Sequence, residues 1–187
     1  MNWVGSPQSL LERGSQKHIN GIAKIIMFYS KHIEKRGSLY TIYSQKDFPI
    51  DFVQDKISRS YRGVIRGFHG DDKTWKLITC LYGKVKLITY DVETSEKKEY
   101  ILSGEDNEQR VILVPPKTLN AHQCLTEECI FHYKWSHYYT SPQDQWSVYF
   151  EDAIINPVWD KSIPLIISKR DAEAGSLLNL KKQLEIP

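Results

Sequence analysis

The chain of 187 residues is 41% hydrophobic and 12% aromatic, so it is long and apolar enough for one domain with a buried core. Its 25 Lys and Arg residues nearly balance 23 Asp and Glu residues, and the net charge of +2 gives no reason to expect a surface for nucleic acid or for an anionic membrane. No stretch approaches the roughly 20 consecutive apolar residues that span a membrane. The sequence therefore predicts a soluble protein in which any basic function is local.

The N-terminal residues and the cysteines both favour the cytoplasm. The chain starts without the positive charges and the apolar run of a secretory signal, so we expect that it is not exported. Three cysteines with no C-x-x-C pair indicate neither a disulfide framework nor a cysteine zinc site. Residues 1–18 are predicted to form an N-terminal extension with a short helix at 9–11, and residues 19–187 a single domain.

From residue 19 onward, short runs rich in Ile, Val, Tyr and Thr alternate with Gly, Pro, Asn and Asp, which is typical of many short strands. Residues 75–81 and 85–91 flank Tyr82-Gly83-Lys84 and predict a hairpin, since glycine can take the positive φ of a tight turn. The other expected strands are residues 22–29, 38–43, 63–68, 99–102, 110–114, 128–135 and 146–150. Leucines at roughly helical intervals in residues 171–184 predict a C-terminal helix, which Gly175 weakens. So many short strands predict an all-β sandwich or barrel with short helices at the two ends.

Six histidines raise the question of a metal site. Barrels of the cupin kind often bind iron or another metal through an H-x-H pair together with Glu and a later His. The chain has no H-x-H pair, and His132 and His137 are spaced so that they would point to opposite faces of a regular strand. The sequence therefore predicts no metal site.

The segment from Arg62 to His69 places two Arg-Gly steps and a histidine around a short apolar run. Glycine lets a ligand approach the backbone, arginine offers a planar fork of donors for phosphate, and histidine moves a proton near neutral pH. The pattern fits an anion-binding site with a general base, and it fits equally well surface ion pairs beside a strand-end histidine. Lys76, seven residues further on, is either a fixed cation for an oxyanion or an ordinary solvated strand residue.

Taken in order, these segments resemble the dTDP-4-dehydrorhamnose 3,5-epimerase family, metal-free cupins that act on nucleotide-linked 4-keto-6-deoxy sugars. The landmarks between residues 34 and 178 are Arg36-Gly37, Gln54-Asp55, Arg62 to His69, Lys76-Leu77, Asn120-Ala-His122, Tyr133-Lys134, Tyr138-Tyr139 and Ser168-Lys-Arg-Asp171. The resemblance implies a cupin jelly-roll barrel over residues 19–187, a dTDP- or GDP-linked sugar substrate and no cofactor. It also implies a cytoplasmic homodimer in which N-terminal strands cross to the partner's sheet.

The resemblance also implies a role for each site residue. His69 would remove the proton beside the C4 ketone, and Asp171 would orient it. Lys76 would hold the enolate, and Tyr133 would return a proton from the opposite face of the ring. The substrate-binding residues would be Arg36, Gln54, Lys56, Arg66, His122, Tyr139 and Arg170, with Tyr138 as an alternative to Tyr139.

The implied reaction is epimerisation at C3, at C5 or at both, in the biosynthesis of deoxysugars for surface glycans such as lipopolysaccharide or capsule. Two alternatives stay open: a sugar-nucleotide 3,4-ketoisomerase, and a cupin that binds a sugar nucleotide without catalysis. Fewer residues separate His69 from Lys76 than in the rhamnose-pathway enzymes, and Thr41, Lys56 and Gln123 depart from the family pattern. These departures leave the sugar and the nucleotide open, and parts of the sequence resemble the branch that acts on unusual deoxysugars and GDP-linked heptoses.

Overall fold

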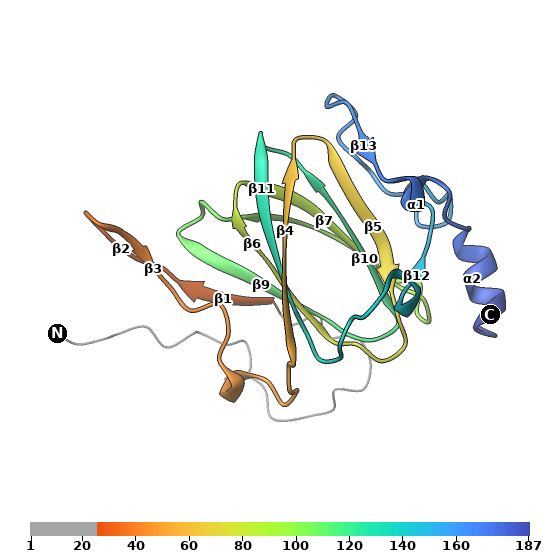
Figure 1. Ribbon diagram of the computed structural model, residues 1–187, viewed down its shortest axis with the longest axis horizontal. Helices are drawn as coiled ribbons and strands as arrows, with labels where there is room; N and C mark the ends of the chain where they lie inside the picture. The colour runs from red at the N-terminus through yellow and green to blue at the C-terminus, as the bar shows by residue number, and fades with distance from the viewer. Residues whose placement is uncertain (1–25) are drawn as a thin grey trace.

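Two β-sheets that face each other make up most of residues 26–187, the part of the chain that this computed structural model describes (Figure 1). The first sheet has the strand order β1 (Ile26–Ser30), β9 (Glu108–Val114), β6 (Lys76–Tyr82), β11 (Glu128–Trp135) and β4 (Gln54–Tyr61). The second sheet has the order β12 (Trp146–Ser147), β5 (Val64–Gly70), β10 (Thr118–Cys124), β7 (Lys84–Asp91) and β8 (Lys97–Ser103), with β13 (Ile166–Ile167) parallel to β5.

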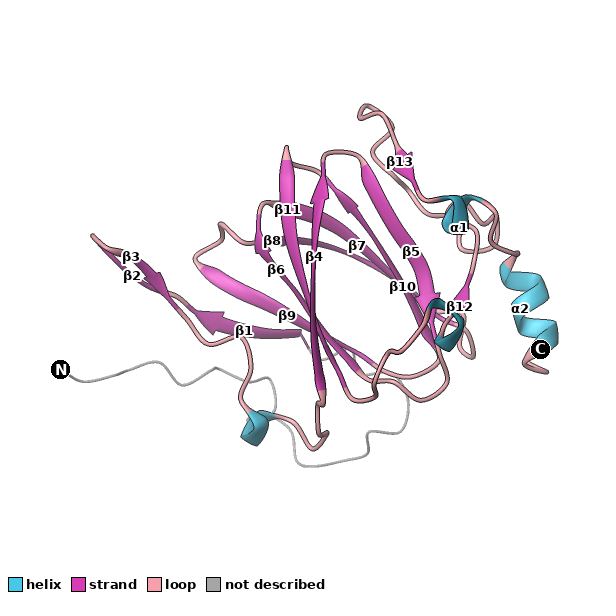
Figure 2. Ribbon diagram, viewed as in Figure 1, coloured by secondary structure: helices cyan, strands magenta, loops and turns pink. Residues whose placement is uncertain are grey.

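The remaining elements are short. β2 (His32–Glu34) and β3 (Gly37–Leu39) form a hairpin that extends away from the two sheets, as Figure 2 shows. The helices are α1 (Lys169–Ala172), α2 (Leu177–Gln183) and single 3-10 turns at Gln45–Asp47 and Pro142–Asp144. The predicted all-β fold is confirmed, whereas the expected helix at 9–11 and the extension at 1–18 lie outside the described residues. Within residues 26–187, no helix is long and apolar enough to cross a membrane.

Apolar clusters fill the space between the sheets and cover both outer faces. The inner cluster includes Ile78, Leu87 and Phe131, which come from both sheets. The outer face of the second sheet packs against the C-terminal part of the chain, and the outer face of the first sheet packs against residues 43–52. Because successive side chains of a strand point to opposite faces of its sheet, one strand can contribute residues to two of these clusters. The inner cluster occupies one end of the space between the sheets and leaves the other end to polar residues.

The predicted hairpin between β6 and β7 is wrong, because these consecutive strands lie in different sheets. Gly83 between them does have a positive φ of 70°, as a tight turn requires. A Cβ at this position would lie only 2.2 Å from the carbonyl oxygen of Glu128, so the chain crosses between sheets directly against the start of β11. A turn residue such as Gly83 predicts that the chain changes direction. Which strand then pairs with β6 or β7 depends on tertiary packing, which cannot be deduced from the local sequence.

Four strands of the structure, β2, β4, β10 and β13, had no counterpart among the predicted ones, and β4 and β10 are the two long ones. β4 and β10 carry polar runs, Gln54 to Tyr61 and Thr118 to Cys124, that lack the usual Val and Ile signal. All seven residues of β10 are nevertheless buried. The predicted strand at 38–43 is shorter than expected and ends at Leu39, and the predicted helix at 171–184 divides into α1 and α2 around Gly175.

Candidate active site

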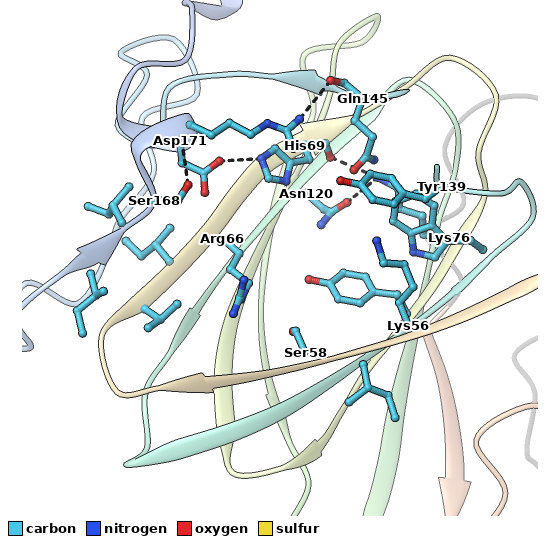
Figure 3. Close-up of a pocket in the computed structure, with 18 residues that line it drawn as sticks. Lys56, Ser58, Arg66, His69, Lys76, Asn120, Tyr139, Gln145, Ser168 and Asp171 are labelled. Atoms are coloured by element: carbon cyan, nitrogen blue, oxygen red, sulfur yellow. Dashed lines mark hydrogen bonds and ion pairs between the residues drawn. The ribbon is translucent and has the colours of Figure 1, made fainter. Parts of the chain in front are cut away.

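A cavity of about 590 Å³ opens between the two sheets at the end that the inner apolar cluster leaves free. β4, β6 and β11 of the first sheet form one wall, and β5, β10 and the segment leading into α1 form the other. Figure 3 shows polar side chains from both walls pointing into the cavity. The lining residues include Lys56, Arg66, His69, Lys76, Asn120, Tyr133, Tyr139, Arg170 and Asp171. The site therefore combines most of the residues that the sequence analysis selected.

His69 and Asp171 form a hydrogen-bonded pair on the wall of the second sheet. His69 Nε2 lies 2.7 Å from Asp171 Oδ1, although 102 positions separate the residues in the chain. Asp171 lies in the first turn of α1, where its backbone N–H donates to the Ser168 side chain that caps this helix. Because Nε2 is bound to the carboxylate, the Nδ1 atom of His69 is the nitrogen left to accept a proton.

The Asp171 carboxyl is held in its ionised form. Burial raises its pKa, but the hydrogen bond and charge of His69 lower it, as do hydrogen bonds with Ser168 and the Gly67 N–H, and the net result is a pKa below the ordinary value. An ionised Asp171 accepts a hydrogen bond from the Nε2–H group of His69 and stabilises a positive charge on the imidazole. The pair therefore has the arrangement of an oriented general base.

Lys76 extends from β6 to the end of the cavity near His69. Its Nζ donates to Asn120 Oδ1 at 3.1 Å and to the His69 carbonyl oxygen at 3.4 Å. The side chain is only 2% exposed, and burial lowers the pKa of its ammonium to about 8. A buried ammonium with one N–H still unused is a suitable donor to an oxyanion formed beside His69.

Tyr133 enters the cavity from β11, on the wall opposite His69. Burial raises the pKa of its phenol well above the ordinary value, so that it is a neutral proton donor at physiological pH. Its hydroxyl lies 3.4 Å from Nδ1 of His122. His122 lies behind the pocket lining, stacked 4.1 Å from the ring centre of Phe131, and burial lowers its pKa to about 3. The His69–Asp171 pair and the Tyr133 phenol thus face each other across one cavity from two different sheets.

Two of the predicted substrate-binding arginines, Arg66 and Arg170, are anchored at the pocket. Arg66 Nε donates to Ser60 Oγ at 2.9 Å, and its Nη2 donates to the Arg59 carbonyl oxygen. Arg170 Nη2 donates to the carbonyl oxygens of Pro142 and Gln145. These contacts fix the guanidinium groups and leave donors for a ligand, since each guanidinium has five N–H groups.

Tyr139, not Tyr138, lies in the pocket, while Tyr138 is 69% exposed. Gln54 Oε1 accepts a 2.8 Å hydrogen bond from the Tyr139 backbone N–H, so Gln54 positions Tyr139 and does not itself line the cavity. Lys56 Nζ lies 3.3 Å from the ring centre of Tyr139. Arg36 is the one predicted binding residue that the structure places far from this pocket: it lies between β2 and β3 and pairs with Glu34.

The sequence analysis assigned no role to three residues of the pocket lining. Trp135, Asn120 and Ser58 all line the cavity. Trp135 is two residues from Tyr133, and Ser58 is two residues from Lys56, so strand periodicity places each on the same face as its neighbour. Residues 128–135 were predicted as a strand, so this two-residue spacing could have placed Trp135 beside Tyr133. It could not have placed Ser58, because β4 had not been predicted as a strand.

The cavity contains cations in excess of carboxylates. Asp171 is the single carboxylate among its lining residues, which also include Lys56, Arg66, Lys76 and Arg170. Within residues 26–187, no group of three or more His, Cys, Asp or Glu side chains has the arrangement of a metal site. The arrangement can bind an anionic ligand and transfer protons at a carbon atom between the two walls.

Comparison with known proteins identifies the family. Residues 17–179 match the family model described as dTDP-4-dehydrorhamnose 3,5-epimerase. The chain belongs to this family. It is 29% identical over 157 residues to the dTDP-4-dehydrorhamnose 3,5-epimerase of Escherichia coli, covering 77% of this chain and 84% of that relative.

Solved structures of the family share the fold. The dTDP-4-dehydrorhamnose 3,5-epimerase of Elizabethkingia anophelis is 30% identical, with a TM-score of 0.68 over 82% of this chain and 92% of that one. A dTDP-6-deoxy-D-glucose-3,5-epimerase from Legionella pneumophila, in complex with dTDP-4-keto-L-rhamnose, is 26% identical, with a TM-score of 0.74 over 85% and 91% of the two chains. The predictions of a cupin fold and of an isomerase are therefore confirmed.

Proposed function

We propose that this family member epimerises C3, C5 or both in a nucleotide-linked 4-keto-6-deoxy sugar, in the biosynthesis of deoxysugars for surface glycans. The observation that carries the proposal is the placement of the His69–Asp171 pair and Tyr133 on opposite walls of one cavity. Inversion of a carbon centre requires that a proton leave one face of the ring and another arrive at the opposite face. Two groups on facing sheets meet this requirement.

The reaction begins at His69. With Nε2 bound to Asp171, Nδ1 removes the proton from the carbon beside the C4 ketone, and the carboxylate stabilises the resulting imidazolium. The electron pair of the broken C–H bond forms a C=C bond, and negative charge develops on the C4 oxygen. Lys76, held by Asn120 and the His69 carbonyl, supplies positive charge at that oxygen.

Tyr133 completes the inversion by donating its phenolic proton to the carbon from the other side of the ring. The phenol is neutral because burial raises its pKa, and its hydroxyl lies 3.4 Å from His122 Nδ1 at the back of the pocket. After turnover, exchange with solvent removes the proton gained by His69 and restores the one lost by Tyr133. His69 and Tyr133 can act in the same way at C3 and at C5, because both carbons adjoin C4.

The cationic mouth of the cavity suits the diphosphate of a dTDP- or GDP-linked sugar. Arg66 and Arg170 have free guanidinium donors there, and Lys56 adds a third cation. Arg36 extends away from its own pocket with β2 and β3, so in a homodimer it would serve the pocket of the second copy.

Hydrogen exchange tests this function. The protein is incubated in D₂O with dTDP- and GDP-linked 4-keto-6-deoxy sugars, and the C3 and C5 signals are followed by proton NMR. Loss of both signals indicates a 3,5-epimerase, and loss of the C3 signal alone a 3-epimerase. We expect His69→Asn to lower the exchange rate by on the order of 10²- to 10⁴-fold. His137→Asn is the matched control, because His137 lies outside the pocket lining.

Other outcomes contradict the proposal. A carbonyl that moves from C4 to C3 without inversion would identify a 3,4-ketoisomerase. Binding of a sugar nucleotide with no exchange at either carbon, and identical behaviour of the wild type and His69→Asn, would identify a non-catalytic binding cupin.

A further inference from the structure

Lys56 and Lys76 place two ammonium groups at one aromatic ring. The Nζ atoms of Lys56 and Lys76 lie 5.0 Å and 5.1 Å from the ring centre of Trp135. β11, which carries Trp135, lies between the strands of the two lysines, and Lys76 is directly opposite Trp135 in register. Figure 3 shows both lysines extending into the same cavity. The two positive charges therefore act on one another across the indole.

No carboxylate of the pocket lining neutralises this pair. Asp171, the single carboxylate there, is bound to His69. Lys76 donates only to an amide oxygen and a backbone carbonyl oxygen. Lys56 contacts the rings of Trp135 and Tyr139 and has no oxygen partner within residues 26–187. Cation–π contacts stabilise an ammonium without removing its charge, so the repulsion between the lysines persists.

We propose that Lys56 is a positioning residue that acts through Lys76: repulsion across Trp135 prepares Lys76 to transfer a proton to the C4 oxygen of the substrate, beyond holding it as a fixed cation. This inference rests on the proposed epimerase function and adds to it the group that protonates the oxygen. Desolvation and a second cation both lower the pKa of a lysine, so its ammonium releases a proton more readily.

The proton transfer balances. As His69 takes the proton from carbon, the C–H electron pair becomes the new C=C bond and the carbonyl π pair moves to oxygen. One N–H bond of Lys76 breaks while an O–H bond forms, so a neutral enol and an amine replace an oxyanion and an ammonium. When Tyr133 delivers its proton to carbon, the enol returns the O–H proton to the Lys76 amine and the ketone is restored.

The electrostatics of the pocket support this role. Burial lowers the pKa of Lys76 to about 8, Asp71 raises it, and Lys56 lowers it. Burial also lowers the pKa of Lys56. The other titratable or charged groups that line the cavity are Arg66, His69, Tyr133, Tyr139, Arg170 and Asp171. Asp171 is the only negative group among them and is already paired, so Lys56 can be varied without removing a carboxylate partner of Lys76.

A titration of the lysine side chains tests the inference without substrate. The protein is labelled with ¹³C at lysine Cε, Lys76→Met assigns the Lys76 signal, and its shift is followed against pH by NMR. We expect Lys56→Met to raise the pKa of Lys76 by about one unit, because a like charge is removed. In Lys56→Arg, the pKa of Lys76 should stay as low as in the wild type, because the positive charge is kept. Lys134→Met is the matched control: Lys134 also lies over an aromatic ring, that of Tyr43, but outside the cavity.

Kinetics give a second readout. The exchange rate requires protonated Lys76, so it falls as pH rises through the pKa near 8. Lys56→Met should move this alkaline limb upward by about one pH unit and lower kcat at pH 7 by roughly 3-fold, because a weaker acid gives up its proton less readily. In Lys56→Arg, both the pH of the alkaline limb and kcat should stay close to their wild-type values.

An unchanged Lys76 titration in Lys56→Met would overturn the inference even if turnover fell. A raised KM with an unchanged alkaline limb would likewise overturn it, since Lys56 would then only bind the anionic substrate. Absence of exchange in the wild type with every donor is the separate failure of the proposed function. The substrate-free titration distinguishes the two failures.

Discussion

At the scale of single residues, the chemistry of the site depends on which partner each side chain meets. His69 has the orientation that a general base needs because Asp171 occupies its Nε2 atom. Burial lowers the pKa of Lys76 to about 8, and burial also keeps the Tyr133 phenol neutral by raising its pKa. The sequence analysis selected all four of these residues, yet for His69 and Lys76 it left a structural role open. Only their neighbours in space distinguish a catalytic group from a solvated strand residue.

Asp171→Asn tests the dependence of His69 on its partner. An amide carries no negative charge to stabilise an imidazolium, and its NH₂ can donate to Nε2 and so favour the wrong tautomer of His69. We therefore expect kcat to fall by on the order of 10²- to 10⁴-fold with a smaller change in KM. Solvent-exchange kinetics measure the effect. Glu173→Gln, which also removes a carboxylate at α1 but from an exposed position, should retain full activity. Equal activity of the two variants would show that Asp171 does not support the base.

At the scale of elements, the strands that position the site were the hardest to predict. β10 supplies Asn120 and His122 to the interior, and β4 supplies Lys56 and Ser58, but both strands are polar. Polar side chains are buried along β10 and buried or half-buried on one face of β4, so the usual link between apolar residues and buried strands does not hold. Pairing between β10 and β7 extends over Thr118–Cys124, and this backbone pairing, not side-chain type, defines the strand.

The close contact of Gly83, between β6 and β7, with the start of β11 leads to a prediction about stability. In Gly83→Ala the new Cβ would lie 2.2 Å from the Glu128 carbonyl oxygen at a φ of 70°, so either the turn or the start of β11 must shift. We expect the free energy of unfolding to fall by about 2–3 kcal/mol. Thermal or urea unfolding measures it. Gly175→Ala is the control, because a Cβ there meets no atom within 4 Å, and its stability should stay close to that of the wild type.

At the scale of the whole molecule, exposed apolar side chains lie on the β2–β3 hairpin, which follows the edge strand β1 of the first sheet, and on β4, the opposite edge strand of that sheet. Ile33 and Leu39 on the β2–β3 hairpin are 60% and 61% exposed, and Ile57 and Tyr61 on β4 are 66% and 61% exposed. Apolar residues on a projecting hairpin and on an edge strand are suited to contact with a second copy of the chain. This distribution supports the prediction of a homodimer.

Light scattering tests the dimer. We expect a mass of twice the 21.8 kDa of one chain at micromolar concentration. The double substitution Ile33→Asp and Leu39→Asp should shift the equilibrium toward the monomer, since it places charges in an apolar contact. Leu178→Asp, at an exposed apolar position on α2, should leave the dimer intact. A wild type that is monomeric under these conditions would contradict the prediction.

Short runs of strand-forming residues were enough to predict the all-β class, and ordered motifs such as Arg62 to His69 and Ser168 to Asp171 were enough to predict the family, because both are local patterns of residues. The three-dimensional fold was needed to show that β6 and β7 join different sheets, that Tyr139 and not Tyr138 enters the pocket, and that Trp135 lies between two lysines. The physical reason is that strand pairing and burial depend on contacts between distant segments. Those contacts place His69 and Tyr133 on opposite walls and so make inversion possible.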